Sequence, residues 1–336
     1  MNRLQSMDIP PAWRRSVERI AQKGMRKILV IGASDRGKST YCSFLAAELC
    51  SVGHEVAFVD ADVGQKDVGP PAAITLAHLT DGKALPEAEM SGLYFIGSVS
   101  PIGHFLPMVV GAQRMVQAAR SRFVIIDTTG LIHGSGRQLK AFKIEALQPD
   151  VIVALERGYE LESLLNAYRH YPLIRLWPSR EASAKSVRQR QAARENAFRR
   201  YFEGASEIVI ERHRLSFQRS LLFNGRPVKD ERFVYAEQTS DGRIGVSQAG
   251  DQVAAKGERI IPYGFERGLL CGVADRNATV LGLAILQSID FATGTIALLT
   301  PVPERLIKIV QMGDMHLDRD GRELRHGAPL SPGDPT

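Results

Sequence analysis

One segment, from Gly32 to Thr40, constrains the fold more than any other, because it matches the phosphate-binding loop pattern G-x-x-x-x-G-K-[ST] at every fixed position. The apolar, β-branched run at 28–31 before it predicts a buried strand, and residues 39–49 after it predict a helix. Gly32 and Gly37 let backbone N–H groups turn toward a phosphate. Lys38 can then reach the terminal phosphates, and Ser39 can offer its hydroxyl to Mg²⁺.

The rest of the chain alternates apolar strands with helices. We predict further strands at 55–59, 93–96, 123–126, 151–155 and 173–176, helices at 9–25, 105–119, 137–147 and 160–168, and a loop-rich insertion at 72–92. This alternation is typical of an α/β fold, a P-loop NTPase whose mostly parallel sheet is covered on both faces. In such folds ligands bind at the carboxyl ends of the strands.

Acidic residues stand at two of those strand ends. Asp60 and Asp62 follow the strand at 55–59, and Asp127 ends the strand at 123–126. A carboxylate beside a phosphate loop can hold Mg²⁺, directly or through water, or take a proton from a nucleophile. Turns also recruit Asp for backbone hydrogen bonds, so the sequence leaves open which of Asp60 and Asp62 faces the metal.

A basic segment carries the excess positive charge. The chain has 43 basic and 37 acidic residues, a net charge of +6, and residues 175–200 hold eight basic residues against two acidic ones. A helix predicted at 182–202 places Arg190 and Arg194 one turn apart. Beside a phosphate loop they could act as arginine fingers supplied in cis; the alternative is an ordinary solvated helix face.

Composition sets the domain number and the compartment. With 336 residues, 44% of them hydrophobic and 24% charged, we expect a globular protein of two domains, with no apolar run of membrane-spanning length and no signal peptide. Cys42, Cys50 and Cys271 are too few and too scattered for a disulfide framework or a zinc site, which favours a cytoplasmic location.

Four regions are predicted along the chain. They are an N-terminal helical arm at 1–25, a P-loop kinase domain with an arginine-bearing lid at 26–205, a smaller β-rich domain at 206–330 and a disordered tail at 331–336. Short apolar segments such as 208–210, 221–223 and 306–310 are the strand candidates of the β-rich domain.

From about residue 28 to 202 the chain resembles the polynucleotide 5′-hydroxyl kinases, the family of the kinase subunit of the messenger-RNA cleavage factor and the kinase of pre-ribosomal RNA processing. The loop 32–40 is similar to that family's nucleotide loop, and 62–65 (Asp-Val-Gly-Gln) to its metal and base motif. Residues 100–103 (Ser-Pro-Ile-Gly) resemble the clasp that closes over the nucleotide. Residues 128–136 and 190–202 resemble the Thr-x-Gly segment and the lid.

The resemblance implies ATP and Mg²⁺ as cofactors and assigns roles to residues. The catalytic groups are Lys38, Asp62, Arg190 and Arg194, the metal is held by Ser39, Asp62 and Asp127, and the acceptor lies near Gln65, Thr129 and Gly130. The nucleotide contacts are Gly32, Ser34, Asp35, Arg36, Gly37, Lys38, Ser39, Thr40, Ser100, Pro101 and Gly103.

Two departures from the family's pattern bear on recognition. Eukaryotic members carry a β-rich domain before the kinase that helps hold the base of ATP. Here about 25 residues precede the predicted kinase domain, so recognition of adenine is open. Where those members have a Trp that stacks on a substrate base, this chain has Leu131. Such stacking contributes about 1–3 kcal/mol per base, so its loss predicts weaker or less selective binding of nucleic acid.

The leading hypothesis is an ATP-dependent kinase for the 5′-hydroxyl of RNA or DNA in RNA processing or repair. Its expected partners are single-stranded 5′ ends and RNA-processing proteins, and no association with a membrane is expected. The alternatives are a non-catalytic ATP-binding scaffold, a GTPase or ATPase of related fold, and a small-molecule kinase. The chain lacks the Asn-Lys-x-Asp guanine motif and a His- or Cys-rich tract, and its basic lid suits a long anionic substrate.

Overall fold

The computed structural model describes residues 9–80, 85–248 and 254–324, and the chain forms two compact units, 1–197 and 198–336. The boundary lies inside helix α6 (Val187–Phe202). In the described part of the chain, no helix is long and apolar enough to cross a membrane. The tail predicted to be disordered, 331–336, lies outside the described residues.

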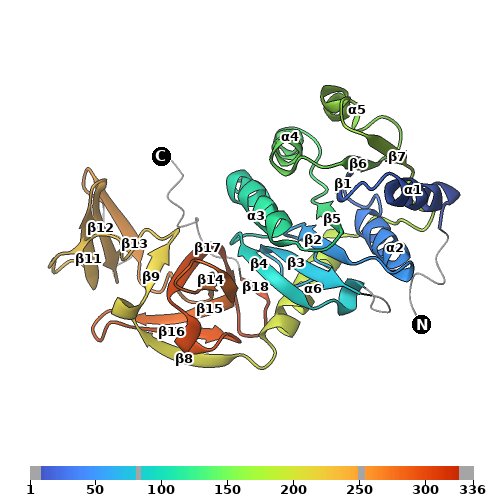
Figure 1. Ribbon diagram of the computed structural model, residues 1–336. Coiled ribbons are helices and arrows are strands. Elements are labelled where there is room, and N and C mark those ends of the chain that lie inside the picture. The colour runs from blue at the N-terminus through green and yellow to red at the C-terminus, as the bar shows by residue number, and fades with distance from the viewer. Residues whose placement is uncertain (1–8, 81–84, 249–253, 325–336) are drawn as a thin grey trace. The chain divides into compact units, whose positions relative to one another are not determined.

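The first unit is built on a seven-stranded sheet in the order β4-β3-β2-β5-β1-β6-β7 (Figure 1). Five strands run parallel to one another: β1 (Lys27–Ile31), β2 (Val56–Ala61), β5 (Phe123–Thr128), β6 (Val151–Leu155) and β7 (Leu173–Leu176). The antiparallel strands β3 (Ala73–Leu79) and β4 (Met90–Phe95) complete it. The predicted α/β fold with a mostly parallel sheet is therefore confirmed.

The loop-rich insertion predicted at 72–92 is wrong, since β3 and the start of β4 occupy much of it. Nearly every residue of β3 is buried, so the segment has no apolar-polar alternation by which to recognise it. The segment is held as a strand by its pairing with β2 on one side and β4 on the other. That pairing is a tertiary interaction that local propensity does not report.

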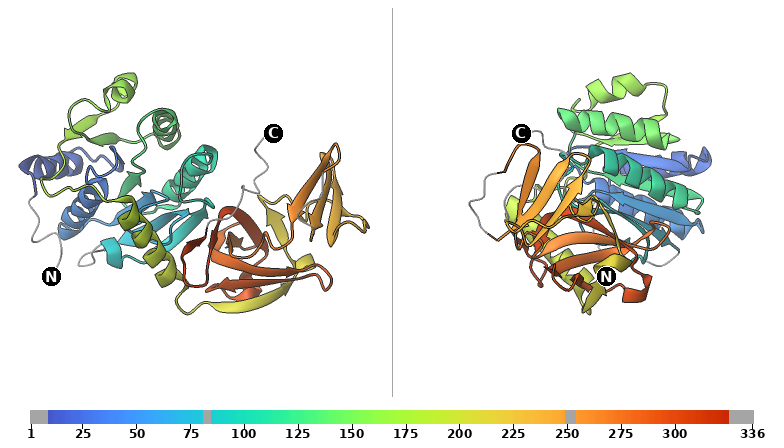
Figure 2. Two further views of the ribbon diagram at one scale, coloured as in Figure 1. Left: turned by 180° about the vertical axis from the view of Figure 1, so that it is seen from behind. Right: turned by 90° about the vertical axis from the view of Figure 1, so that its left-hand side faces the viewer.

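Helices cover both faces of this sheet (Figures 1 and 2). Helices α1 (Pro11–Gln22) and α2 (Lys38–Ser51) bury Trp13 and Phe44 in a core on one face. Helices α3 (Phe105–Ala118) and α4 (Ser135–Leu147) bury Met108 and Leu139 in a second core on the other. The helix predicted at 160–168 is shorter, and consists of α5 (Glu162–Leu165) and a 3-10 turn, η3 (Asn166–Tyr168).

The second unit is β-rich, as predicted. One sheet has the order β18-β17-β14-β15-β16-β8 with β9 paired to β17, and a second has the order β10-β11-β12-β13. Its strands are β8 (Ser206–Glu211), β9 (Ser216–Gln218), β10 (Arg226–Pro227), β11 (Tyr235–Thr239), β12 (Gly242–Ser247), β13 (Glu258–Pro262), β14 (Leu269–Ala274), β15 (Val280–Asp290), β16 (Thr295–Thr300), β17 (Ile309–Leu317) and β18 (Glu323–Leu324). The remaining 3-10 turns of the chain are η2 (Leu85–Glu87), η4 (Arg212–Arg214) and η5 (Glu304–Leu306).

The prediction of a strand at 221–223 is wrong, and one other strand and one helix begin later than predicted. Arg219 and Phe223 have φ angles of 55° and 71°, left-handed conformations that no strand accommodates, so this apolar triplet enters the core as irregular chain. The strand predicted from residue 306 begins at Ile309, after η5. The basic helix predicted from residue 182 begins at Val187.

Candidate active site

The loop between β1 and α2 has the backbone geometry of an anion site. Gly37 caps α2 with a φ of 76°, a left-handed conformation that suits glycine. A Cβ on Gly32 would lie 2.3 Å from the carbonyl oxygen of Leu155, so a side chain cannot fit there. The Nζ of Lys38, a residue only 7% exposed, donates to the carbonyl of Ala33 at 3.0 Å. The positive end of a fourteen-residue helix and a buried ammonium thus meet at one point.

A hydroxyl and a carboxylate lie side by side next to this loop. The Oγ of Ser39 donates to Oδ2 of Asp127 at 2.6 Å. Burial raises the pKa of the Asp127 carboxyl to about 6, although the ammonium of Lys38 acts against this rise. Oxygen donors of this kind fit a hard cation such as Mg²⁺. No group of three or more His, Cys, Asp and Glu among the described residues could hold a metal ion.

The structure separates the two acidic residues that the sequence left equivalent. Asp60 is 1% exposed, and its carboxylate pairs with the Nζ of Lys66 at 3.0 Å and accepts from the backbone N–H of Asp67 at 2.8 Å and of Val68 at 3.2 Å. All these partners belong to the loop that follows β2. Asp60 therefore holds this loop in shape and is not among the residues that line the adjoining cavity.

Asp62 lies in that cavity. Its Oδ1 accepts from the backbone N–H groups of Gly64 at 2.9 Å and Gln65 at 3.0 Å, which fixes the turn. The side-chain amide of Gln65 donates to the carbonyl of Arg190 at 3.2 Å, so this turn is joined to α6. The geometry favours Asp62 over Asp60 as the group that meets a ligand.

The cavity has a volume of about 290 Å³ and brings together most of the residues singled out in the sequence. Arg190 and Arg194 reach it from α6, and the guanidinium of Arg190 pairs with the carboxylate of Asp35 in the phosphate loop. The predicted site residues in its wall are Ser34, Asp35, Gly37, Lys38, Ser39, Thr40, Asp62, Gln65, Gly130, Arg190 and Arg194.

Other predicted residues lie elsewhere. Arg36 forms a bidentate pair with Glu160, at 2.8 and 2.9 Å, so its guanidinium braces the loop from outside the cavity. Thr129 is 4% exposed and is not among the residues of the cavity wall. A Cβ on Gly130 would lie 2.2 Å from the Oγ of Ser34, so that glycine allows its segment to approach the phosphate loop. The predicted clasp, 100–103, lies within the described residues and contributes no residue to the cavity wall.

Two buried lysines near the site were not predicted from the sequence. Lys140 and Lys143 are both 0% exposed on α4. The Nζ of Lys140 donates to the carbonyl and the hydroxyl of Thr129 at 2.7 and 2.9 Å, and the Nζ of Lys143 donates to the carbonyl of Ala61 at 3.3 Å. Burial lowers the pKa of Lys140, and lowers that of Lys143 to about 8. Their helical spacing with Leu139 and Ile144 was the signal that could have placed them on the buried face.

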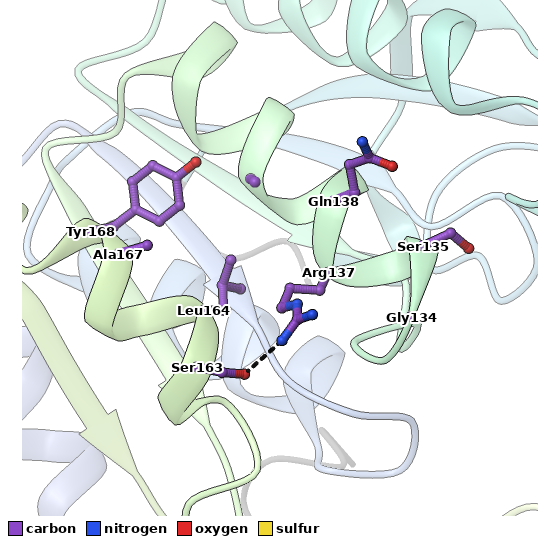
Figure 3. Close-up of a pocket in the computed structure, with 9 residues that line it drawn as sticks. Gly134, Ser135, Arg137, Gln138, Ser163, Leu164, Ala167 and Tyr168 are labelled. Carbon is purple, nitrogen blue, oxygen red and sulfur yellow. Dashed lines mark hydrogen bonds between the residues drawn. The ribbon is translucent and has the colours of Figure 1, made fainter.

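A second pocket, of about 620 Å³, lies between α4 and the α5–η3 segment (Figure 3). Arg137 donates to the hydroxyl of Ser163 across it at 3.2 Å, and Leu164 and Ala167 supply apolar wall. The hydroxyl of Tyr168 in its wall donates to Glu145 at 2.6 Å. Its wall holds none of the predicted site residues, whereas the cavity at the phosphate loop holds most of them.

A family model and several known proteins are similar to this chain. The family model of the mRNA cleavage and polyadenylation factor CLP1 P-loop matches residues 32–204. The polyribonucleotide 5′-hydroxyl-kinase of Pyrococcus furiosus is 35% identical to this chain, in an alignment that covers 94% of this chain and 95% of the relative's length. That of Methanocaldococcus jannaschii is 33% identical over 89% of each, and the Clp1 kinase of Xenopus tropicalis is 25% identical over 88% of this chain and 71% of its own.

Among solved structures, Clp1p in its complex with Pcf11p superposes with a TM-score of 0.61, over 90% of this chain and 78% of the matched chain. At 13% sequence identity this likeness shows a shared fold. The phosphate loop, the α/β sheet and the β-rich second unit are therefore features of an established architecture.

Proposed function

Because the chain belongs to the CLP1 P-loop family, we propose that it is a polynucleotide kinase, which transfers the γ-phosphate of ATP to the 5′-hydroxyl of RNA or DNA. One observation carries the proposal: Lys38, Asp62 and Arg190 line a single cavity, although they come from three separate segments of the chain. Phosphoryl transfer requires a cation that binds the phosphates, a carboxylate that meets the acceptor and an arginine that stabilises the transferred group.

In this mechanism the chain acts mainly by position and charge. The N–H groups of the phosphate loop and the ammonium of Lys38 bind the phosphates, and Asp62 orients the 5′-hydroxyl or accepts its proton. The 5′-oxygen forms a bond to the γ-phosphorus as the bond from that phosphorus to the bridging oxygen of ADP breaks. Arg190 and Arg194 stabilise the charge on the phosphoryl group in transit.

Ser39 and Asp127 are the proposed ligands of Mg²⁺, and Asp62 is a further candidate. Bound there, the ion would neutralise charge on the β- and γ-phosphates. The existing hydrogen bond from Ser39 to Asp127 supports this assignment, because it already holds two oxygen donors together.

RNA is the acceptor to test first, since the curated relatives are named polyribonucleotide kinases. Single-stranded 5′ ends suit a site whose wall includes basic residues from α6. The cytoplasmic location and association with RNA-processing proteins are part of the same proposal.

The test supplies the purified full chain with γ-labelled ATP, Mg²⁺ and matched 5′-hydroxyl RNA and DNA oligonucleotides, with the Lys38→Ala variant as control. We expect label on the 5′ end with the wild type and none with the variant, whose terminal-phosphate contact is removed. Tight ATP binding with no label on either oligonucleotide would refute the kinase and favour a non-catalytic scaffold.

A further inference from the structure

An exposed tryptophan stands at the end of β7. The chain has two tryptophans; Trp13 is fully buried, whereas Trp177 is 67% exposed. Trp177 directly follows Leu176, the last residue of β7. A large aromatic surface left in water at the carboxyl end of a parallel strand, where α/β sheets bind their ligands, suggests a ligand contact.

The strand order indicates which part of a nucleotide would lie there. The phosphate loop follows β1. On one side of β1, Asp62 directly follows β2 and Asp127 lies in β5, whereas β6 and β7 lie on the other side. In ATP the base and the γ-phosphate are at opposite ends of the molecule. If the γ-phosphate points toward Asp62, the base extends toward the ends of β6 and β7.

The chain itself connects Trp177 to the cavity. Glu181 and Ala182, four and five residues further on, already line the cavity, so Trp177 lies within about 14 Å of chain from its wall. A Cβ on Gly37 would lie 3.9 Å from the Cβ of Ala182, which places this segment against the start of α2.

The same segment is anchored at both ends. The indole N–H of Trp13 donates to the carbonyl of Trp177 at 3.0 Å. At the far end, the guanidinium of Arg157 donates to the carbonyl of Ala182 at 3.5 Å, and within the segment the backbone N–H of Ala182 donates to the carbonyl of Ser179 at 3.0 Å. The backbone of Trp177 is therefore fixed while its indole remains open to solvent, which is the arrangement that a stacking surface needs.

We propose that the indole of Trp177 is the surface on which the adenine of ATP stacks. The proposal rests on the assigned nucleotide site and adds to it the recognition of the base, which the phosphate loop cannot supply. Stacking uses the face of the ring and needs no fixed hydrogen bond, so one exposed indole on a fixed backbone is sufficient for it.

The first test is steady-state kinetics. We expect Trp177→Ala to raise the KM for ATP about tenfold and to change kcat less than about twofold, because the lost contact is to a part of ATP remote from the reacting bond. Trp177→Phe should restore most of the affinity. The matched control is Phe142→Ala, which removes another exposed aromatic side chain of the same unit, 47% exposed on α4. An unchanged KM in Trp177→Ala would overturn the proposal.

The second test measures binding alone, by tryptophan fluorescence without acceptor. In the wild type, ADP with Mg²⁺ should quench the emission of the exposed tryptophan, whereas tripolyphosphate, which has no base, should not. Trp177→Phe keeps only the buried Trp13 and should show no quenching by ADP. Quenching that persists in Trp177→Phe would refute the assignment. If Trp177→Phe loses the quenching but the wild type transfers no phosphate, the kinase proposal is refuted and the base site is upheld.

Discussion

Replacing Arg190 with alanine is the sharpest test of how this cavity works. The side chain of Arg190 is 27% exposed, pairs with Asp35 of the phosphate loop and lines the same cavity as Lys38 and Asp62. In related P-loop enzymes an arginine aimed at the transferred phosphoryl contributes about 10³ to 10⁵ in kcat. Arg194, one turn further along α6, remains in the variant, so we take the lower end: a fall in kcat of about 10³, or about 4 kcal/mol in activation free energy.

The loss of stability should be much smaller than the loss of activity. Arg190 and Asp35 are partly exposed, at 27% and 16%, and a pair of this kind contributes about 1 kcal/mol or less to the free energy of unfolding. The assay is kcat at saturating ATP and acceptor, together with the Kd of ATP and the melting temperature of each variant. We expect kcat to fall steeply while the Kd of ATP and the melting temperature change little.

Two variants decide between catalysis and structure. Arg188→Ala removes an exposed arginine of the same helix that is not among the residues of the cavity wall, and should leave kcat unchanged. Asp35→Asn breaks the ion pair and keeps the guanidinium, and should cost far less than Arg190→Ala. A loss of less than about tenfold in Arg190→Ala, or an equal loss in Asp35→Asn, would refute the role of Arg190 in the transition state.

Two further predictions concern buried charge. Asp60→Asn should lower the free energy of unfolding by about 3 kcal/mol, because it leaves the 1% exposed side chain of Lys66 without its carboxylate. Asp62→Asn should instead lower kcat with little effect on stability. Equal urea-unfolding midpoints for Asp60→Asn and wild type would contradict the role of Asp60. Burial lowers the pKa of Lys143 from 10.5 to about 8. At pH values between about 8 and 10.5, Lys143 is therefore protonated in the unfolded chain and neutral in the folded protein. Because the unfolded state binds the extra proton, the free energy of unfolding rises with pH in this range. Urea unfolding should show a rise of about 2 kcal/mol between pH 7.5 and 9.5 that is absent in Lys143→Met; parallel pH profiles would disprove it.

The sequence determined the features that depend on neighbouring residues. The phosphate loop is one continuous segment, in which glycines set the backbone and the flanking strand and helix fix its direction, so its position between β1 and α2 was predictable. Buried parallel strands were visible as apolar runs, and their carboxyl ends had to share one edge of the sheet. Arg190 and Arg194 were predictable as a pair on one helix face, because helical spacing is local.

Only the tertiary structure decided which polar groups meet. Asp60 and Asp62 are two positions apart and alike in chemistry, yet the loop after β2 turns so that Asp60 pairs with Lys66 while Asp62 lines the cavity. The pairs Arg36–Glu160 and Arg190–Asp35 join residues separated by 124 and 155 positions. These pairings depend on the order of the strands in the sheet and on the packing of the helices, and no local pattern of residues encodes them.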